Sequence, residues 1–244
     1  MSDEIQRSEK FAGELELLYG DDLVSVVLYG SAARGEYRPG VSDLNILVLL
    51  KGINPPTLRR GSPLARKWVK GGNQTPLMFG EAEWRGSADV FPIEYSDMRD
   101  AHRVLFGIDP FEGMEIDNEH LRLQSEHELR AKLIQLREHY VLSAEKPKEL
   151  GQLLISALPT FLTLFRTLLR LMGRAVPRES GEVIDAVAAE IGFEPGPFQR
   201  VMEARDRKAR FAPTADEPVV IGYLTGVSRA SEWLDRHDSS AQTP

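Results

Sequence analysis

The sequence has no cysteine. Without a thiol, the chain can form neither a disulfide nor a thiolate zinc site, and it has no cysteine nucleophile. Basic residues are the minority charge, because 30 Lys and Arg stand against 37 Asp and Glu, which gives a formal net charge of −7 at pH 7. We therefore do not expect a broad basic surface or nucleic acid as a partner, although a local basic patch is compatible with these numbers.

Long uncharged apolar runs are also scarce. The N-terminal residues 1–20 are charged and lack the apolar core of a signal peptide. The most apolar stretch, residues 153–172, contains Pro159, Arg166 and Arg170. Two charges and a proline favour a buried helix of a bundle over a membrane span. We expect a cytoplasmic protein that makes no membrane contact.

The first half of the chain mixes two periodicities. Apolar residues at helical spacing predict a helix over residues 3–19, and Ser62 followed by Pro63 predicts the start of a second helix over residues 62–70. Short runs rich in aliphatic residues and bounded by turn residues predict four strands. These strands are expected at residues 23–30, 43–50, 75–80 and 88–95.

The second half has a helical periodicity alone. Helices are predicted over residues 117–143, 148–172, 178–191, 195–206 and 217–235, with Gly and Pro between them. The sequence therefore predicts an α+β protein, with a mixed sheet and flanking helices followed by a C-terminal helical bundle. We place the two domains at residues 1–112 and 113–238.

One segment, YGSAARGEYRPGVSDLNILVLL at residues 29–50, combines groups suited to phosphate and metal. Gly30 ends a strand and lets the backbone come close to a ligand, and Ser31 adds a hydroxyl donor. Asp43 follows at the start of the next strand, and side-chain alternation puts it on the same face as Asn45. Mg²⁺ prefers such hard oxygen ligands beside a triphosphate.

The segment resembles the signature of the nucleotidyltransferase superfamily, in its kanamycin-nucleotidyltransferase-like branch. The resemblance implies transfer of a nucleoside monophosphate from a nucleoside triphosphate to a hydroxyl of a small molecule or protein, assisted by Mg²⁺ ions that three carboxylates hold. Gly30 and Ser31 match the phosphate turn, and Asp43 matches the first metal carboxylate. Asn45 stands where the second carboxylate is expected and offers one neutral oxygen in place of an anionic pair.

The third carboxylate of the family lies on a later strand. Candidates are Asp89, Glu94 and Asp97, of which Asp89 and Glu94 point to opposite sides of a regular strand. Glu94 is favoured because it lies among apolar residues, where a carboxylate needs a metal or a partner, and Asp89 is its rival. All of these acids are equally compatible with solvated positions at a strand end.

The basic residues near the turn also have two possible roles. Arg34 and Arg38 are either ligands of the triphosphate or solvated loop charges, and Lys67 and Lys70 are expected on an exposed helix face.

Two functions remain open from the sequence. One is an active, Mg²⁺-dependent nucleotidyltransferase with Asp43 and Glu94 as its catalytic carboxylates. The other is a catalytically degenerate protein that binds a nucleotide or has a regulatory role.

Overall fold

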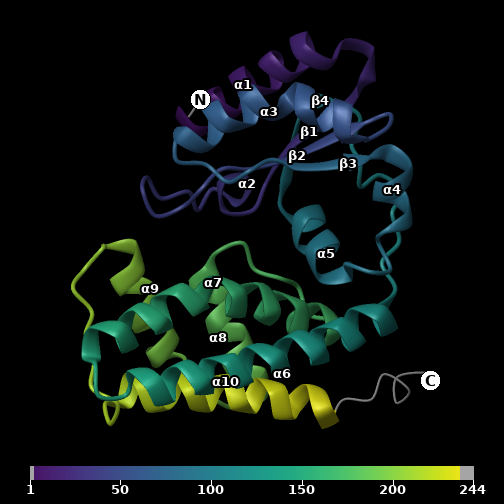
Figure 1. The fold of residues 1–244 in the computed structure, drawn as a ribbon. Coiled ribbons are helices and arrows are strands. Elements are labelled where there is room, and N and C mark those ends of the chain that lie inside the picture. Colours follow the sequence, from purple (N-terminus) through teal and green to yellow (C-terminus); the bar gives the residue numbers. More distant parts are fainter. Residues whose placement is uncertain (1–2, 237–244) are drawn as a thin grey trace. The chain divides into compact units, whose positions relative to one another are not determined.

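The computed structural model describes residues 3–236, and these divide into two compact units with the division between Ile116 and Asp117. The N-terminal unit contains a mixed sheet with helices, and the C-terminal unit contains helices (Figure 1). This confirms the predicted α+β class. The division lies a few residues beyond the expected boundary at 112, and the expected end of the bundle at 238 lies outside the described residues.

The sheet of the N-terminal unit has four strands in the order β3-β2-β1-β4. They are β1 (Leu23–Tyr29), β2 (Asn45–Leu50), β3 (Leu77–Gly80) and β4 (His102–Gly107). Strand β1 pairs antiparallel with both β2 and β4, whereas β2 and β3 run parallel. The parallel pair requires a crossover, and helix α3 (Pro55–Lys70) provides it.

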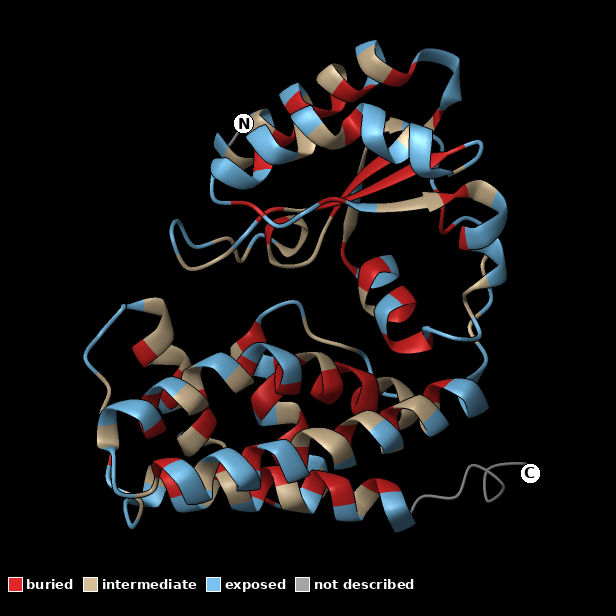
Figure 2. Ribbon diagram, in the orientation of Figure 1, coloured by how far each residue is buried: buried red, intermediate tan, exposed pale blue. Residues whose placement is uncertain are grey.

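Helices cover both faces of this sheet (Figure 1). Because side chains alternate along a strand, Val26 and Leu28 of β1 pack with α1 (Asp3–Tyr19) and α3, whereas Val27 packs on the opposite face. Helices α4 (Glu81–Gly86) and α5 (Pro92–Asp100) contribute Trp84, Tyr95 and Met98 to that opposite face. Burial follows this layering, with the buried positions along the central strands and on one side of each helix (Figure 2).

The predicted strand over residues 88–95 is wrong. Pro92 begins helix α5, where its missing N–H costs nothing and its fixed φ suits the first helical position. The buried side chains of α5 recur at helical spacing, and Tyr95 stacks on Trp84 with ring centroids 4.1 Å apart. The fourth strand of the sheet is instead β4, which pairs with β1 on the side away from β2 and was not predicted from the sequence.

Other element bounds differ less. Helix α3 begins at Pro55, seven residues before the expected start, because the Asn54 side chain accepts a hydrogen bond from the Thr57 N–H at 2.9 Å and caps the helix. Pro63 therefore lies inside α3. The short α2 (Ser31–Arg34) and α4 and the single 3-10 turn η1 (Gly20–Asp22) also had no counterpart in the prediction.

The C-terminal unit contains the five helices that the periodicity predicted. They are α6 (Asn118–Ser143), α7 (Pro147–Leu171), α8 (Ser180–Ile191), α9 (Gly196–Asp206) and α10 (Pro218–Arg236). Among residues 3–236, α7 alone is long and apolar enough to span a membrane by length and composition, and 56% of its most apolar window is buried inside the protein. Phe161 and Phe165 of α7 pack against the aromatic rings of α9 and α10, as expected of a core helix.

Candidate functional site

Gly30 shapes the turn between β1 and α2. Its backbone has φ 78° and ψ −148°, a region that essentially only glycine occupies. Its N–H donates to the Ala101 carbonyl at 3.2 Å, which fixes the turn against the start of β4. Ser31 begins α2, and the first N–H groups of a helix have no partner within the helix. The turn therefore offers backbone donors and the Ser31 hydroxyl, and phosphate binding there stays a prediction.

Asn45 lies directly beside this turn. It is the first residue of β2 and pairs across the sheet with Tyr29, the residue before Gly30. A Cβ placed on Gly30 would lie 3.1 Å from Asn45 Nδ2. Asp43 is exposed and lies two residues earlier, whereas Leu44 between them is fully buried. The strand pairing thus brings the Gly30 turn and the segment of Asp43 and Asn45 to the same end of the sheet.

Gln74 is the residue that the sequence analysis missed. Its side-chain amide donates to Asp43 Oδ2 at 2.7 Å. The contact follows from the parallel pairing of β2 and β3, in which Leu47 lies opposite Leu77, because the segments that lead into the two strands then run side by side. The position of Gln74 just before the strand that follows β2 was a usable signal. It was missed because only carboxylates were considered as partners of Asp43. Asp43 therefore contacts the amide of Gln74, and the amide of Asn45 lies beside the Gly30 turn at the same end of the sheet.

Arg34 is held by a partner within the protein. Its guanidinium donates to Asp97 Oδ1 at 2.5 Å and to the Asp97 carbonyl at 3.3 Å. The Arg34 and Asp97 side chains are only 7% and 17% exposed. This pair joins α2 to α5, and it holds the Arg34 guanidinium against Asp97.

The two favoured candidates for the third carboxylate do not lie on a strand. Glu94 is in the first turn of α5, and Asp89 is in the turn before it, and both are exposed. Glu94 was favoured because a carboxylate among apolar residues needs a metal or a partner, but Glu94 lies on the exposed side of α5, and strand alternation applies to neither residue. The segment that the sheet places next to Asp43 is the approach to β3, where Gln74 lies.

Tyr29 and His102 continue the row of side chains across the sheet, since Tyr29 pairs with Asn45 on one side and with His102 on the other. Burial raises the pKa of Tyr29, so its hydroxyl stays neutral at physiological pH. The His102 ring lies between two acceptors, with Nδ1 2.8 Å from the Arg99 carbonyl and Nε2 3.2 Å from Asp109 Oδ2. His102 therefore fixes local structure beside the site.

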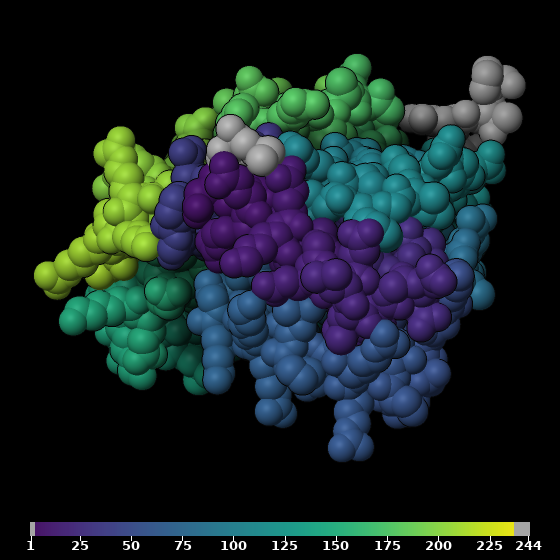
Figure 3. Space-filling model, turned by 90° about the horizontal axis from the view of Figure 1, so that it is seen from above, coloured from purple at the N-terminus to yellow at the C-terminus, as the bar shows by residue number. Residues whose placement is uncertain are grey.

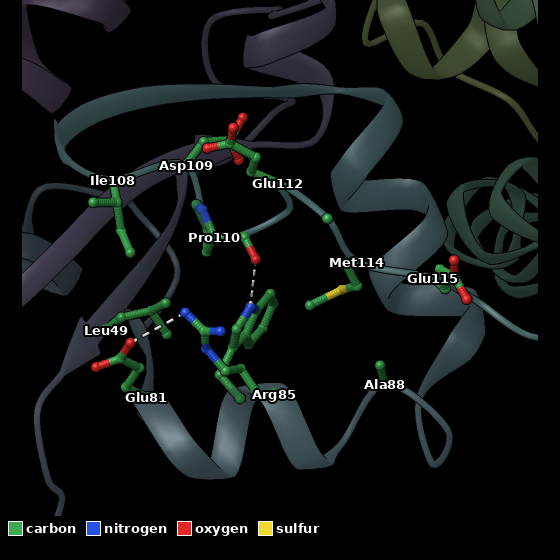
Figure 4. Close-up of a pocket in the computed structure, with 12 residues that line it drawn as sticks. Leu49, Glu81, Arg85, Ala88, Ile108, Asp109, Pro110, Glu112, Met114 and Glu115 are labelled. Atoms are coloured by element: carbon green, nitrogen blue, oxygen red, sulfur yellow. Dashed lines mark hydrogen bonds and ion pairs between the residues drawn. The ribbon is translucent and has the colours of Figure 1, made fainter.

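A separate pocket of about 280 Å³ lies elsewhere in the N-terminal unit (Figure 4). Its walls come from α4 and from the segment after β4, with Trp84 donating to the Pro110 carbonyl at 3.1 Å and Arg85 paired with Glu81 at 3.3 Å. Neither Gly30 nor Asp43 lines it. The pocket is thus distinct from the site at the Gly30 turn.

The donor set at the turn does not fit a pair of metal ions. Asp43 provides one carboxylate, and Asn45 and Gln74 each provide one neutral carbonyl oxygen. Across residues 3–236, no group of three or more His, Cys, Asp or Glu is arranged to hold a metal ion. A two-metal site draws on carboxylates that bridge or flank both ions, and two of these three side chains carry no charge.

Comparisons with known proteins agree with this fold. Residues 8–72 match the model of the nucleotidyltransferase domain family, a span from α1 through α3 that includes the Gly30 turn, Asp43 and Asn45. The crystal structure of spectinomycin adenyltransferase AAD(9) from Enterococcus faecialis with ATP and spectinomycin is similar, with a TM-score of 0.56 and 12% sequence identity over 92% of this chain and 98% of that chain. At this identity the likeness shows a shared fold.

A toxin–antitoxin structure with AMP-PNP has 19% identity, a TM-score of 0.30, and coverage of 41% of this chain and 74% of that chain, which is too distant to carry an argument. No curated protein matches the sequence. The family match shows a nucleotidyltransferase domain at residues 8–72, and the similar adenyltransferase shows a fold shared over most of the chain.

Proposed function

We propose that the N-terminal unit binds a nucleoside triphosphate at the Gly30 turn and has lost the metal-assisted transfer step. The turn keeps the features that suit phosphate, namely a glycine backbone that only glycine adopts, free helix-start N–H groups and the Ser31 hydroxyl. What it lacks is the set of carboxylates that the transfer chemistry requires. The protein would then act as a nucleotide-binding or regulatory member of its superfamily.

The hydrogen bond from Gln74 to Asp43 carries this proposal. An amide donor 2.7 Å from Asp43 Oδ2 occupies one of the lone pairs through which this carboxylate could bind a cation. Asn45 cannot compensate, because its amide is neutral. One carboxylate and two amides therefore provide far less charge than a pair of divalent cations needs for stable binding.

A second candidate function is transfer assisted by a single cation. It is favoured by the exposure of Asp43, since Mg²⁺ often binds through one carboxylate together with the phosphates of its nucleotide. In that case the acceptor would be a hydroxyl of a small molecule or a protein. The similar adenyltransferase was solved with ATP and spectinomycin, so spectinomycin is a reasonable first acceptor to test.

Calorimetric titration with ATP separates these functions. The proposal expects ATP to bind both in EDTA and in excess Mg²⁺, because the protein contributes no metal site of its own. The Ser31→Ala variant should bind ATP about two- to tenfold more weakly, as expected for the loss of one hydrogen bond of about 0.5–1.5 kcal/mol. Ser62→Ala, the same change on α3, is the matched control and should bind like the wild type.

Two outcomes would overturn the proposal. Absence of ATP binding at millimolar ATP concentration would show that the turn does not bind the triphosphate. Binding that requires Mg²⁺, together with release of pyrophosphate when ATP and spectinomycin or another hydroxylated acceptor are supplied, would establish single-cation transfer instead.

A further inference from the structure

A segment of the N-terminal unit departs from the acidic character of the chain. No Asp or Glu occurs between Asp43 and Glu81, whereas six basic residues do. Five of these six lie on α3, which has no acidic residue at all. The six are Lys51, Arg59, Arg60, Arg66, Lys67 and Lys70.

One side of α3 is neutralised by α1 and the residues that follow it. Lys67 Nζ lies 2.8 Å from Glu14 Oε1 of α1. Arg60 donates to the Leu18 carbonyl, and its guanidinium lies 5.4 Å from the centre of the Tyr19 ring. Lys67 and Arg60 therefore stabilise the packing of α3 against α1.

The other cations of α3 lack such partners. Arg59, Arg66 and Lys70 are exposed, and within the described part of the chain none of the three forms a hydrogen bond or an ion pair. They are separated by seven and four residues, so they lie on one side of the helix over about 16 Å. We call these three residues the basic stripe. Figure 3 shows the blue surface of α3 beside the purple surface of α1.

We propose that the basic stripe binds the phosphate backbone of nucleic acid without reading its sequence. Two of its three residues are arginines, whose planar guanidinium groups match phosphate oxygens in a bidentate geometry. A row of cations along one helix suits a polymer with regularly spaced negative charges. The net charge of −7 opposes a broad contact, so the interaction is local, weak and sensitive to salt.

An anionic membrane surface fits this helix less well. Helices that lie in a membrane interface insert aromatic and large apolar side chains beside their cations. The aromatic residue of α3, Trp68, is instead only 7% exposed and stacks on Phe11 of α1 with ring centroids 4.2 Å apart. Helix α3 exposes two aliphatic side chains, Leu58 at 44% and Val69 at 42%, but it has no aromatic anchor.

Fluorescence anisotropy with a labelled 20-base-pair duplex tests the proposal. Three phosphate contacts predict a slope of log affinity against log salt of about −2.7, which is about a 40-fold loss between roughly 50 and 200 mM salt. The variant R59Q/R66Q/K70Q should lose this binding and its salt slope. The control K148Q/R178Q/R210Q removes two arginines and one lysine, all exposed, from the C-terminal unit and should bind like the wild type.

Saturating ATP should leave duplex binding unchanged, which keeps this result independent of the nucleotide site at Gly30. The proposal is overturned by absence of binding at low salt, by equal losses in the two triple variants, or by ATP displacing the duplex. It is also overturned if vesicles with anionic lipid bind through the same three residues while the duplex does not.

Discussion

The double substitution Asn45→Asp and Gln74→Glu is expected to create a cation site beside Asp43. In the wild type, Gln74 Nε2 donates to Asp43 Oδ2 at 2.7 Å. Glutamate at position 74 replaces this hydrogen bond with repulsion between two carboxylates. Two unit charges about 4 Å apart interact by about 1 kcal/mol in water and by about 4 kcal/mol near a protein surface. Because Asp43 and Gln74 are both exposed, we expect the lower end of this range.

The variant should therefore be less stable than the wild type in EDTA and should regain stability with Mg²⁺. If the restored site binds Mg²⁺ with a Kd of about 1 mM, then about 10 mM Mg²⁺ stabilises the folded state by roughly 1.4 kcal/mol. The measurement is thermal unfolding of the N-terminal unit within the full chain, in EDTA and over a series of Mg²⁺ concentrations. Titration of Mn²⁺ followed by electron paramagnetic resonance gives the number of bound ions.

The control is the pair Asn118→Asp and Gln152→Glu, which adds the same two charges to exposed positions in the C-terminal unit. It should show no stabilisation by Mg²⁺ beyond that of the wild type. The reasoning is refuted if wild-type protein already binds Mn²⁺ as tightly as the double variant. It is refuted as well if the double variant gains no cation affinity while it remains folded.

Two further predictions concern the ion pair beside the site and the start of helix α6 in the C-terminal unit. Arg34→Met should destabilise the protein by about 2–4 kcal/mol, because the largely buried carboxylate of Asp97 then loses its cation. In a double-mutant cycle followed by urea unfolding, the double variant with Asp97→Asn should recover part of that loss. Hydrogen bonds from the backbone N–H groups of His120 and Glu119 lower the pKa of Asp117 below its ordinary 3.8. A lowered pKa in the folded state adds stability above the unfolded pKa, so the advantage of the wild type over Asp117→Asn should be full at neutral pH and disappear as the pH falls below about 4 through the lowered pKa. Urea unfolding from pH 3 to 7 measures this difference, and a difference independent of pH would contradict the assigned cause.

The sequence predicted the residues of the turn because the signal there is local. Gly30, Ser31, Asp43 and Asn45 are joined by a short loop between two adjacent strands, and alternation along β2 follows from backbone geometry alone. Helical periodicity predicted the C-terminal helices for the same reason, since buried positions recur along one stretch of chain. The predicted strand over residues 88–95 failed where local preference is ambiguous, because Pro92 fits an edge strand and also the first turn of a helix.

The sequence by itself determined the kind of fold, the glycine turn at residue 30 and the absence of an acid at position 45. Only the tertiary structure decided what surrounds Asp43 and where Arg34 points. Gln74 reaches Asp43 because β3 pairs parallel to β2 after a crossover through α3, and Arg34 reaches Asp97 because α5 packs on the sheet. Contacts between residues 31 or more positions apart depend on how distant elements pair and pack, which no local pattern of side chains specifies.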